Sequence, residues 1–255
     1  TDGFPLDLQD VIASENGFVV DHAGFDAELE RAKERSHGSK LHDGAAVDAA
    51  YHAIAREIPA TRFTGYESET GRSRVTALLR DGARATSLRG GEAGQVITAL
   101  TPFYGVSGGQ VGDRGVIRAG DAVFEVDDTQ KPVDGLFVHE GRMVKGSLET
   151  GADVELAVDH ARRSSTRRNH SATHLLHWAL RTVVGPTALQ KGSLVGPDRL
   201  RFDYSGSRPL EREEIARIEA LVNGKVLLNA PIETEVLPMA DAKRKGAIGI
   251  FEEKY

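Results

Sequence analysis

The chain has 255 residues, of which 40% are hydrophobic and 27% charged, the balance of an ordinary globular protein. Its formal net charge of −6 argues against a surface that binds nucleic acid everywhere, but it permits a local basic patch. The absence of cysteine excludes disulfides, thiolate metal ligands and cysteine nucleophiles within these residues. No apolar run approaches the roughly 20 residues that cross a bilayer, and no secretory pattern opens the chain. We therefore expect a cytoplasmic protein with no membrane partner.

Residues 1–60 are expected to form a helical segment. Apolar residues at helical spacing predict a short helix around 6–12, a second helix that begins near Asp21, and a third from about 45 to 58 that Pro59 ends. Helices of this length cannot bury their apolar stripes alone. We therefore expect them to pack on further residues that precede Thr1.

From 61 to 160 the apolar period changes to alternation, which indicates strands. Asp81-Gly82 lies between two such runs and is a strong hairpin signal. Short strands separated by Gly and Asp turns are typical of a small β-barrel or a strongly bent sheet. We expect strands at 75–79, 83–88, 95–100, 115–118, 122–126, 136–139 and 154–158.

Residues 161–255 are expected to form an α+β layer, which makes the fold class of the chain α+β. One amphipathic helix is predicted from His170 to Val184, and Gly185-Pro186 ends it. The pattern then predicts a strand pair at 190–195 and 199–204, a helix at 210–228, an edge-like strand at 232–236 and a basic helix that begins at Asp241.

The helix predicted at 170–184 carries three histidines on one stripe, opposite its apolar side: His170, His174 and His177. Two histidines four apart can reach one metal ion, and neutral imidazole is a common zinc ligand. Ser171 stands where the metalloprotease motif HExxH needs its glutamate, so this is not that motif. A solvated polar face that contains histidine explains the spacing equally well.

Two further segments are candidate ligand sites. The glycine-rich run from Phe103 to Asp113 has neither Walker nor dinucleotide spacing. Its glycines fit either a backbone that approaches a ligand or a corner of the barrel. The densest basic cluster directly precedes the predicted histidine helix and fits either a phosphate contact or a solvated helix face. It consists of Arg162, Arg163, Arg167 and Arg168.

Several motifs resemble the editing domain of alanyl-tRNA synthetase, in the order and at the spacing of that family. They are TPFYGVSGGQVGDRG, VDDTQK, NHSATHLLH, QKGSLV, RLRFDYS, PIETEV and FEEKY, and the opening GFPLDL resembles the end of the tRNA-recognition domain. The resemblance covers essentially the whole chain. It implies a fragment with three parts: a helical tail of the tRNA-recognition domain at 1–60, a β-barrel-like subdomain at 61–160 and a truncated editing core at 161–255.

The resemblance implies hydrolysis of the ester that joins serine or glycine to the 3′ end of tRNA(Ala), while alanyl-tRNA is spared. A pocket for alanine discriminates against such small differences by only about 10–200-fold, so a second, hydrolytic site is needed. His170 and His174 match the zinc pair of the family, and the arginine cluster would contact the acceptor end of tRNA(Ala). The expected pocket residues are Gln190, Gly192, Ser193, Gly108, Gly109 and Gln110. Phe202 is expected in the core and His177 in a supporting or solvated position, and no catalytic residue is assigned.

The zinc site is expected to be incomplete in this chain. The other ligands of the family are a Cys and a His, four apart, downstream of Tyr255, so the resemblance implies weak zinc binding and slow deacylation here. Tightly held zinc would require another side chain, such as Asp203 or His160. Zinc could activate water or hold the amino group of the substrate, and both roles stay open. ATP and Mg²⁺ would bind only in the adenylation domain, within the rest of the synthetase chain.

Two other interpretations stay open. The first is a free-standing trans-editing aminoacyl-tRNA deacylase, against which the GFPLDL opening and the missing Cys and His speak. The second is a non-catalytic RNA-binding module with incidental histidines. Hydrolysis of seryl-tRNA and alanyl-tRNA by this chain and by a longer one separates the three.

Overall fold

The structure is a computed structural model that describes residues 13, 17–22, 24–25, 44–206 and 208–247. Contacts divide the chain into two compact units, 1–49 and 50–255. The helix expected at 6–12, most of the helix expected from Asp21, and the motifs GFPLDL and FEEKY lie outside the described residues. Within the part that is described, no helix combines the length and the apolar character needed to span a membrane.

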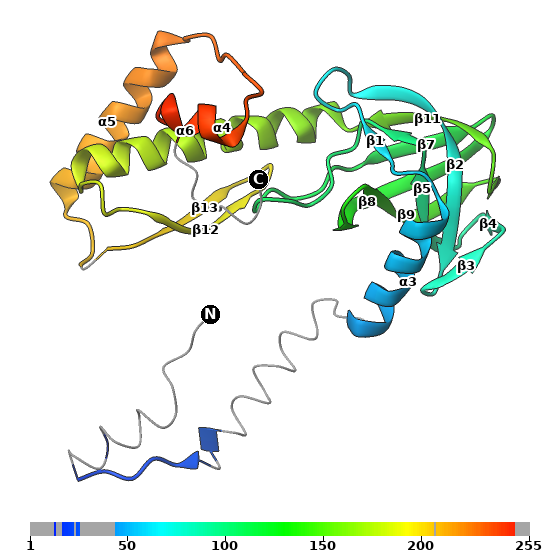
Figure 1. Cartoon of the computed structure of the whole chain (residues 1–255), viewed down its shortest axis with the longest axis horizontal. Helices are drawn as coiled ribbons and strands as arrows, with labels where there is room; N and C mark the ends of the chain where they lie inside the picture. The colour runs from blue at the N-terminus through cyan, green and yellow to red at the C-terminus, as the bar shows by residue number, and fades with distance from the viewer. Residues whose placement is uncertain (1–12, 14–16, 23, 26–43, 207, 248–255) are drawn as a thin grey trace. The chain divides into compact units, whose positions relative to one another are not determined.

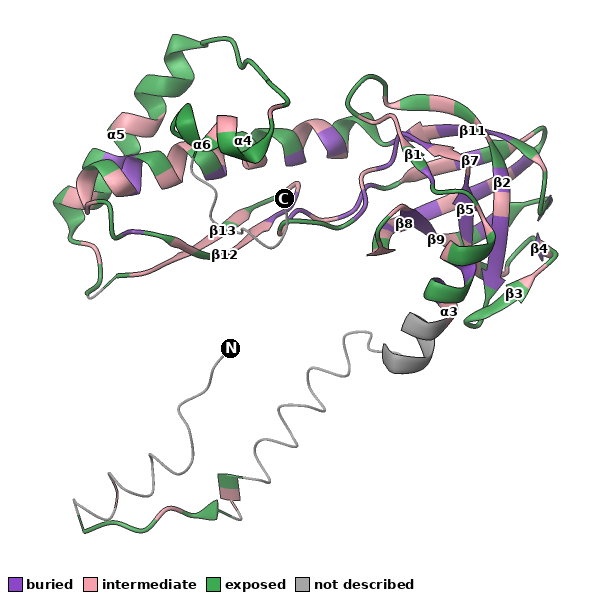
Figure 2. Cartoon of the chain, in the orientation of Figure 1, coloured by how far each residue is buried: buried purple, intermediate pink, exposed green. Residues whose placement is uncertain are grey.

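Six strands close into a β-barrel that surrounds a hydrophobic core (Figure 1). Around the ring they follow the order β11, β7, β8, β9, β5 and β2, and antiparallel pairing of β11 with β2 closes it. Figure 2 shows the buried stretches of these strands in purple. The bounds are Thr70–Arg80 (β2), Ala93–Thr98 (β5), Gly115–Ala119 (β7), Ala122–Val133 (β8), Leu136–Lys145 (β9) and Asp153–Val158 (β11). The small barrel that the sequence predicts is confirmed.

The hairpin at Asp81-Gly82 follows from its turn residues. Bulges explain why the expected lengths of β8 and β9 were wrong. Asp81 and Gly82 have φ of 53° and 76°, the two positive values of a type I′ turn, and they join β2 to β3 (Ala83–Ala85). Strands β8 and β9 run well past the ends expected at 126 and 139. Their pairing shifts register at several points, and each bulge interrupts the alternation on which the expected ends rested.

Two small ladders and one helix accompany the ring. Strand β1 (Arg62–Phe63) pairs in parallel with β6 (Leu100–Thr101), and β4 (Ser87–Arg89) pairs with β10 (Ser147–Glu149). Helix α3 (Gly44–Glu57) agrees with the helix expected at 45–58. Tyr51 and Ile54 of this helix are buried, and the hydroxyl of Tyr51 accepts a hydrogen bond of 2.8 Å from Nε2 of Gln95 in β5. The second half of α3 therefore belongs with the barrel.

One histidine, His139, is fully buried inside the barrel wall. Its Nδ1 lies 2.7 Å from the carbonyl oxygen of Val96, and its Nε2 lies 2.7 Å from Oγ1 of Thr101. A carbonyl oxygen can only accept, so Nδ1 carries the proton and Nε2 accepts from the threonine hydroxyl. Burial lowers the pKa of His139 to about 4.

This buried imidazole predicts a pH-dependent stability. Between pH 6.5 and about 4 the unfolded chain binds a proton at residue 139 that the folded chain does not bind. The contribution of His139 is therefore complete above pH 6.5 and falls by about 3 kcal/mol as the pH drops to 4. Urea denaturation at pH 7 and pH 4.5 measures it, with His139→Gln as the control for all other titrating groups. An equal pH dependence in both proteins would contradict the assignment.

The elements that follow the barrel in sequence are three helices and a strand pair, which form the α+β layer expected at 161–255 (Figure 1). Its core is built from Ala179, Leu180, Ala188 and Ile218, and Phe202 packs against them as expected. The elements are α4 (His160–Val183), β12 (Gln190–Val195), β13 (Leu200–Tyr204), α5 (Arg212–Leu228) and α6 (Met239–Arg244). The expected bounds of the strand pair and of α5 differ from these by one or two residues.

Two expectations for this layer were wrong. The histidine helix begins at His160 and not at His170, because the carboxylate of Asp159 accepts a hydrogen bond of 3.0 Å from the backbone N–H of Arg162 and caps the helix there. The strand expected at 232–236 does not form. No strand among the described residues pairs with this segment, and Ile232 and Val236 are almost fully exposed.

Candidate functional site

Helix α4 places His170 and His174 on successive turns. Their ring centroids lie 5.1 Å apart, and the two planes are tilted by 31°. His170 is half-buried and His174 is exposed. The pKa of His170 is lowered, first by burial and then by the nearby His174. At neutral pH His170 is therefore an uncharged imidazole, the form that binds a metal ion.

The glycine-rich segment turns sharply beside these histidines. Ser107 and Gln110 exchange backbone hydrogen bonds of 2.9 and 3.3 Å across Gly108-Gly109, whose φ values are 57° and 85°. This is a two-residue type I′ turn, which requires positive φ at both central positions. A Cβ on Gly109 would lie 2.4 Å from the carbonyl oxygen of Ser193, whereas one on Gly108 would meet nothing within 4 Å. Gly109 therefore permits close contact between the turn and β12.

Strand β12 is joined to this turn by two backbone hydrogen bonds. The N–H of Val195 donates to the carbonyl of Gly109 at 2.8 Å, and the N–H of Val111 donates to the carbonyl of Val195 at 3.0 Å. Gln110 lies between Gly109 and Val111 in sequence, and its Oε1 is 2.6 Å from Nδ1 of His170. The barrel, β12 and α4 thus meet at one place.

The structure brings together most of the pocket residues expected from sequence. Nε2 of Gln190 donates to Oγ of Ser193 at 3.1 Å, and Ser193 lies against Gly109. These contacts form one continuous series that joins Gln190, Ser193, Gly109, Gln110 and His170. Two expected pocket residues stand apart from it. Gly192 pairs with Asp203 of β13, and Gly108 faces open space.

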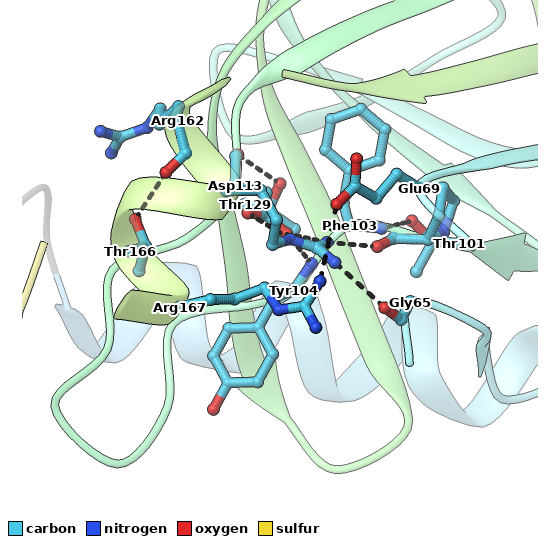
Figure 3. Close-up of polar contacts among 12 residues, drawn as sticks. Gly65, Glu69, Thr101, Phe103, Tyr104, Asp113, Thr129, Arg162, Thr166 and Arg167 are labelled. Carbon is cyan, nitrogen blue, oxygen red and sulfur yellow. Dashed lines mark hydrogen bonds and ion pairs between the residues drawn. The ribbon is translucent and has the colours of Figure 1, made fainter. Parts of the chain in front are cut away.

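A buried ion pair holds the glycine-rich segment to the start of α4 (Figure 3). The side chains of Arg163 and Asp113 are each 5% exposed, and Nε of the arginine lies 2.9 Å from both carboxylate oxygens. Figure 3 labels Asp113, with Gly65 and Tyr104 near it. The same guanidinium donates to the carbonyls of Gly65 at 3.0 Å and Pro102 at 2.6 Å. The carboxylate also accepts from the N–H of Tyr104 at 2.6 Å. Three segments of the barrel are therefore tied to one residue of α4.

The arginine cluster consequently splits into residues with different surroundings. We expected all four to lie before the histidine helix, but all four lie within its first turns. Arg163 was expected to contact phosphate, and the structure gives its guanidinium protein partners instead. Arg167 and Arg168 are exposed, and Arg162 is half-buried with an Nε that makes no hydrogen bond in the described part of the chain. The last three stay candidates for a phosphate contact.

The described residues offer no third protein ligand beside His170 and His174. Within that part of the chain, no group of three His, Cys, Asp or Glu side chains is arranged to hold a metal ion. Of the two substitutes considered from sequence, Asp203 accepts from Nε of Arg201 at 3.1 Å and His160 lies 2.6 Å from Glu69. Both side chains are engaged elsewhere.

His177, expected in a supporting or solvated position, is half-buried. Its ring packs 5.2 Å from that of Phe202, and its Nε2 is buried without a hydrogen bond in the described part of the chain. Its pKa is lowered, chiefly by burial. We assign it to the packing between α4 and β13.

Sequence reasoning missed two residues that shape the site. Asn169 donates from Nδ2 to the carbonyls of Gly196 at 2.8 Å and Pro197 at 3.2 Å, and so fixes the end of β12 against α4. Asp113 was noticed only as the end of the glycine-rich run. Both lie within the motifs that carry the resemblance, Asn169 in NHSATHLLH and Asp113 in TPFYGVSGGQVGDRG, and this position was the available signal.

Comparison with known proteins places the chain in a family. The model of the family described as tRNA synthetases class II (A) matches residues 1–162. The chain belongs to the class II (A) tRNA synthetases. Similar relatives are the proteins named alanine–tRNA ligase from Sorangium cellulosum (strain So ce56), at 53% identity, and from Anaeromyxobacter sp. (strain Fw109-5), at 50%. Each alignment covers 100% of this chain and 29% or 28% of the relative.

A third relative, the alanine–tRNA ligase of Chelativorans sp. (strain BNC1), is 47% identical over 100% of this chain and 29% of its own length. This member of the class II (A) tRNA synthetases thus spans less than a third of the relatives that it matches. The resemblance read from the motifs is confirmed at the level of the family and of the alanine–tRNA ligases as relatives.

Proposed function

We propose that residues 61–255 belong to the editing region of an alanine–tRNA ligase, which hydrolyses seryl- or glycyl-tRNA(Ala). The observation that carries the proposal is the contact of the histidine pair, through Gln110, with the glycine-rich turn and the strand that bears Ser193. The histidines lie beside other polar groups and are not isolated on a solvated face. The names of the relatives supply alanine and tRNA, and the mischarged substrates follow from the resemblance of the motifs.

The two imidazoles fit half of a zinc site. Nδ1 of His170 is hydrogen-bonded to the side-chain amide oxygen of Gln110. A metal-binding histidine commonly makes such a hydrogen bond through the ring nitrogen that does not bind the metal. A catalytic zinc usually has three protein ligands, so we infer that further ligands come from residues outside those described. When bound, zinc would act as a Lewis acid or hold the amino group of the substrate.

Polar groups on β12 can select serine over alanine. The hydroxyl of Ser193 and the amide of Gln190 form a hydrogen-bonded pair at the turn. A serine hydroxyl could join this pair, whereas an alanine methyl would leave polar groups unpaired on binding. Sites built to bond a hydroxyl reject analogues that lack it far more strongly than apolar pockets reject an extra group.

Exposed arginines on α4 would hold the RNA. Arg167 and Arg168 lie on the helix that carries the histidine pair, within one turn of His170. We infer that they neutralise phosphates at the acceptor end of tRNA(Ala), which would make binding weaken as the salt concentration rises. ATP-dependent attachment of alanine to tRNA(Ala) is assigned to the remaining part of the synthetase chain.

Deacylation assays test this proposal. A chain extended to the length of the relatives is expected to hydrolyse seryl-tRNA(Ala) and to spare alanyl-tRNA(Ala). His174→Ala should lower that rate by at least about 100-fold, since the loss of a residue that merely supports a metal ligand costs 10–100-fold. The control is His160→Ala on the same helix, whose side chain is 79% exposed and lies far from the pair. An unchanged rate in His174→Ala would refute the proposed site.

The same assay decides among the other interpretations. Full serine-specific hydrolysis by the 255-residue chain alone would indicate a free-standing trans-editing deacylase. Binding of tRNA with no hydrolysis in either length would indicate a non-catalytic RNA-binding module.

A further inference from the structure

Gln110 is a buried polar residue whose side chain meets an imidazole. It is 6% exposed, and its Oε1 lies 2.6 Å from Nδ1 of His170, 60 residues away in sequence. From the sequence we expect this glutamine to contact the substrate. Its amide oxygen is instead directed at the histidine, so its role must be sought there.

The backbone of Gln110 is fixed on both sides of this contact. On one side its N–H donates to the carbonyl of Ser107 at 2.9 Å, within the type I′ turn. On the other side Val111 donates to the carbonyl of Val195, and Val195 donates to the carbonyl of Gly109. These hydrogen bonds fix the Cα–Cβ direction of Gln110, and the burial of its side chain limits the rotamers that remain.

The contact selects one tautomer of His170. An amide oxygen only accepts, so a hydrogen bond to Oε1 requires a proton on Nδ1 and leaves the lone pair on Nε2. A histidine side chain without such a partner favours the opposite tautomer, with the proton on Nε2. Nε2 of His170 has a lone pair for a metal ion only in this tautomer, and the ring of His174, the other imidazole of the pair, lies 5.1 Å away.

We propose that Gln110 is a positioning residue, which holds His170 as the Nδ1–H tautomer and leaves Nε2 free as a ligand atom. The tautomer follows from the contact alone. Its use in metal binding rests on the proposed function.

Nitrogen NMR of the imidazoles tests the tautomer in the metal-free 255-residue chain at neutral pH. His170 is expected to carry its proton on Nδ1. Gln110→Leu should move the proton to Nε2, while Gln110→Glu, whose carboxylate also accepts, should keep it on Nδ1. His139 is the internal reference, because the carbonyl of Val96 fixes it as Nδ1–H in all three proteins. A proton on Nε2 of His170 in the unaltered chain, or no change in Gln110→Leu, would overturn the proposal.

Metal affinity provides a second readout. Zinc titration should show binding weakened about 10–100-fold in Gln110→Leu and not weakened in Gln110→Glu. Equal affinity of Gln110→Leu and the unaltered chain would overturn the link to the metal. The outcomes are separable from those of the deacylation assay: a chain that shows the expected tautomers and hydrolyses no aminoacyl-tRNA upholds this inference and refutes the proposed activity.

Discussion

Replacement of Arg163 by methionine is expected to lower the free energy of unfolding by about 3–5 kcal/mol. Methionine matches the apolar stem of the arginine and removes its charge, so the carboxylate of Asp113 stays buried without a counter-ion. Breaking a buried ion pair by removing one partner costs this much because the remaining charge is uncompensated. The carbonyls of Gly65 and Pro102 lose their donors in addition. Urea denaturation with linear extrapolation measures the change.

The matched control is Arg167→Met, four residues further along α4. Its side chain is 71% exposed and its nearest carboxylate oxygen, on Glu69, is 3.9 Å away, so the change should stay within about 0.5 kcal/mol. The double variant Arg163→Met/Asp113→Asn should be more stable than Arg163→Met alone, since it no longer buries an unpaired charge. A loss below about 1 kcal/mol in Arg163→Met would show that the ion pair does not hold α4 to the barrel.

Alanine at Gly109 is expected to cost more than alanine at the neighbouring Gly108, although both glycines have positive φ. At either position an L-residue in this conformation costs about 1–2 kcal/mol. At Gly109 the added Cβ would also lie 2.4 Å from a backbone oxygen of β12, so the turn or the strand must move. Forcing extra volume into a packed contact costs about 1–3 kcal/mol more.

Thermal or urea unfolding of Gly109→Ala and Gly108→Ala measures this difference, and nitrogen NMR of His170 shows its local effect. Because Gln110 follows Gly109 directly, displacement of the turn in Gly109→Ala should weaken the contact between Gln110 and His170. Gly108→Ala should leave that contact intact. Equal losses of stability in the two variants would mean that the turn does not press against β12.

Local patterns were sufficient where the structure depends on neighbours in sequence. Asp81-Gly82 predicted a hairpin because only a few residue types adopt two successive positive φ values, and the turn is of that type. Gly185-Pro186 predicted the end of α4, which stops at Val183. The N-terminal end of α4 was missed even though Asp159 is a preferred capping residue, because residues 160–169 have almost no apolar side chains to mark a helical period.

Contacts between distant residues could not be predicted in the same way. Arg163 and its partner Asp113 are 50 residues apart, and no local pattern distinguishes this arginine from the exposed Arg167 or Arg168. The pairing of Gln110 with His170 spans 60 residues. The prediction of a strand at 232–236 was wrong for a related reason. Alternation of apolar and polar side chains suggests a strand, but it does not show that a neighbouring strand is present to pair with it.

The closure of the barrel by β11 and β2 has a consequence for biosynthesis. Strand β2 leaves the ribosome well before its partner, since Gly71 pairs with Leu156, 85 residues later. Until then it has an open edge, and such long-range pairing is the slow step in forming sheets. Strand β11, which closes the barrel, ends at Val158. Asp159 then caps the start of α4, and Arg163 anchors this helix to Asp113. Because α4 follows β11 directly in sequence, a nascent chain that stalls before residue 153 lacks both the strand that closes the barrel and the helix that carries the histidines.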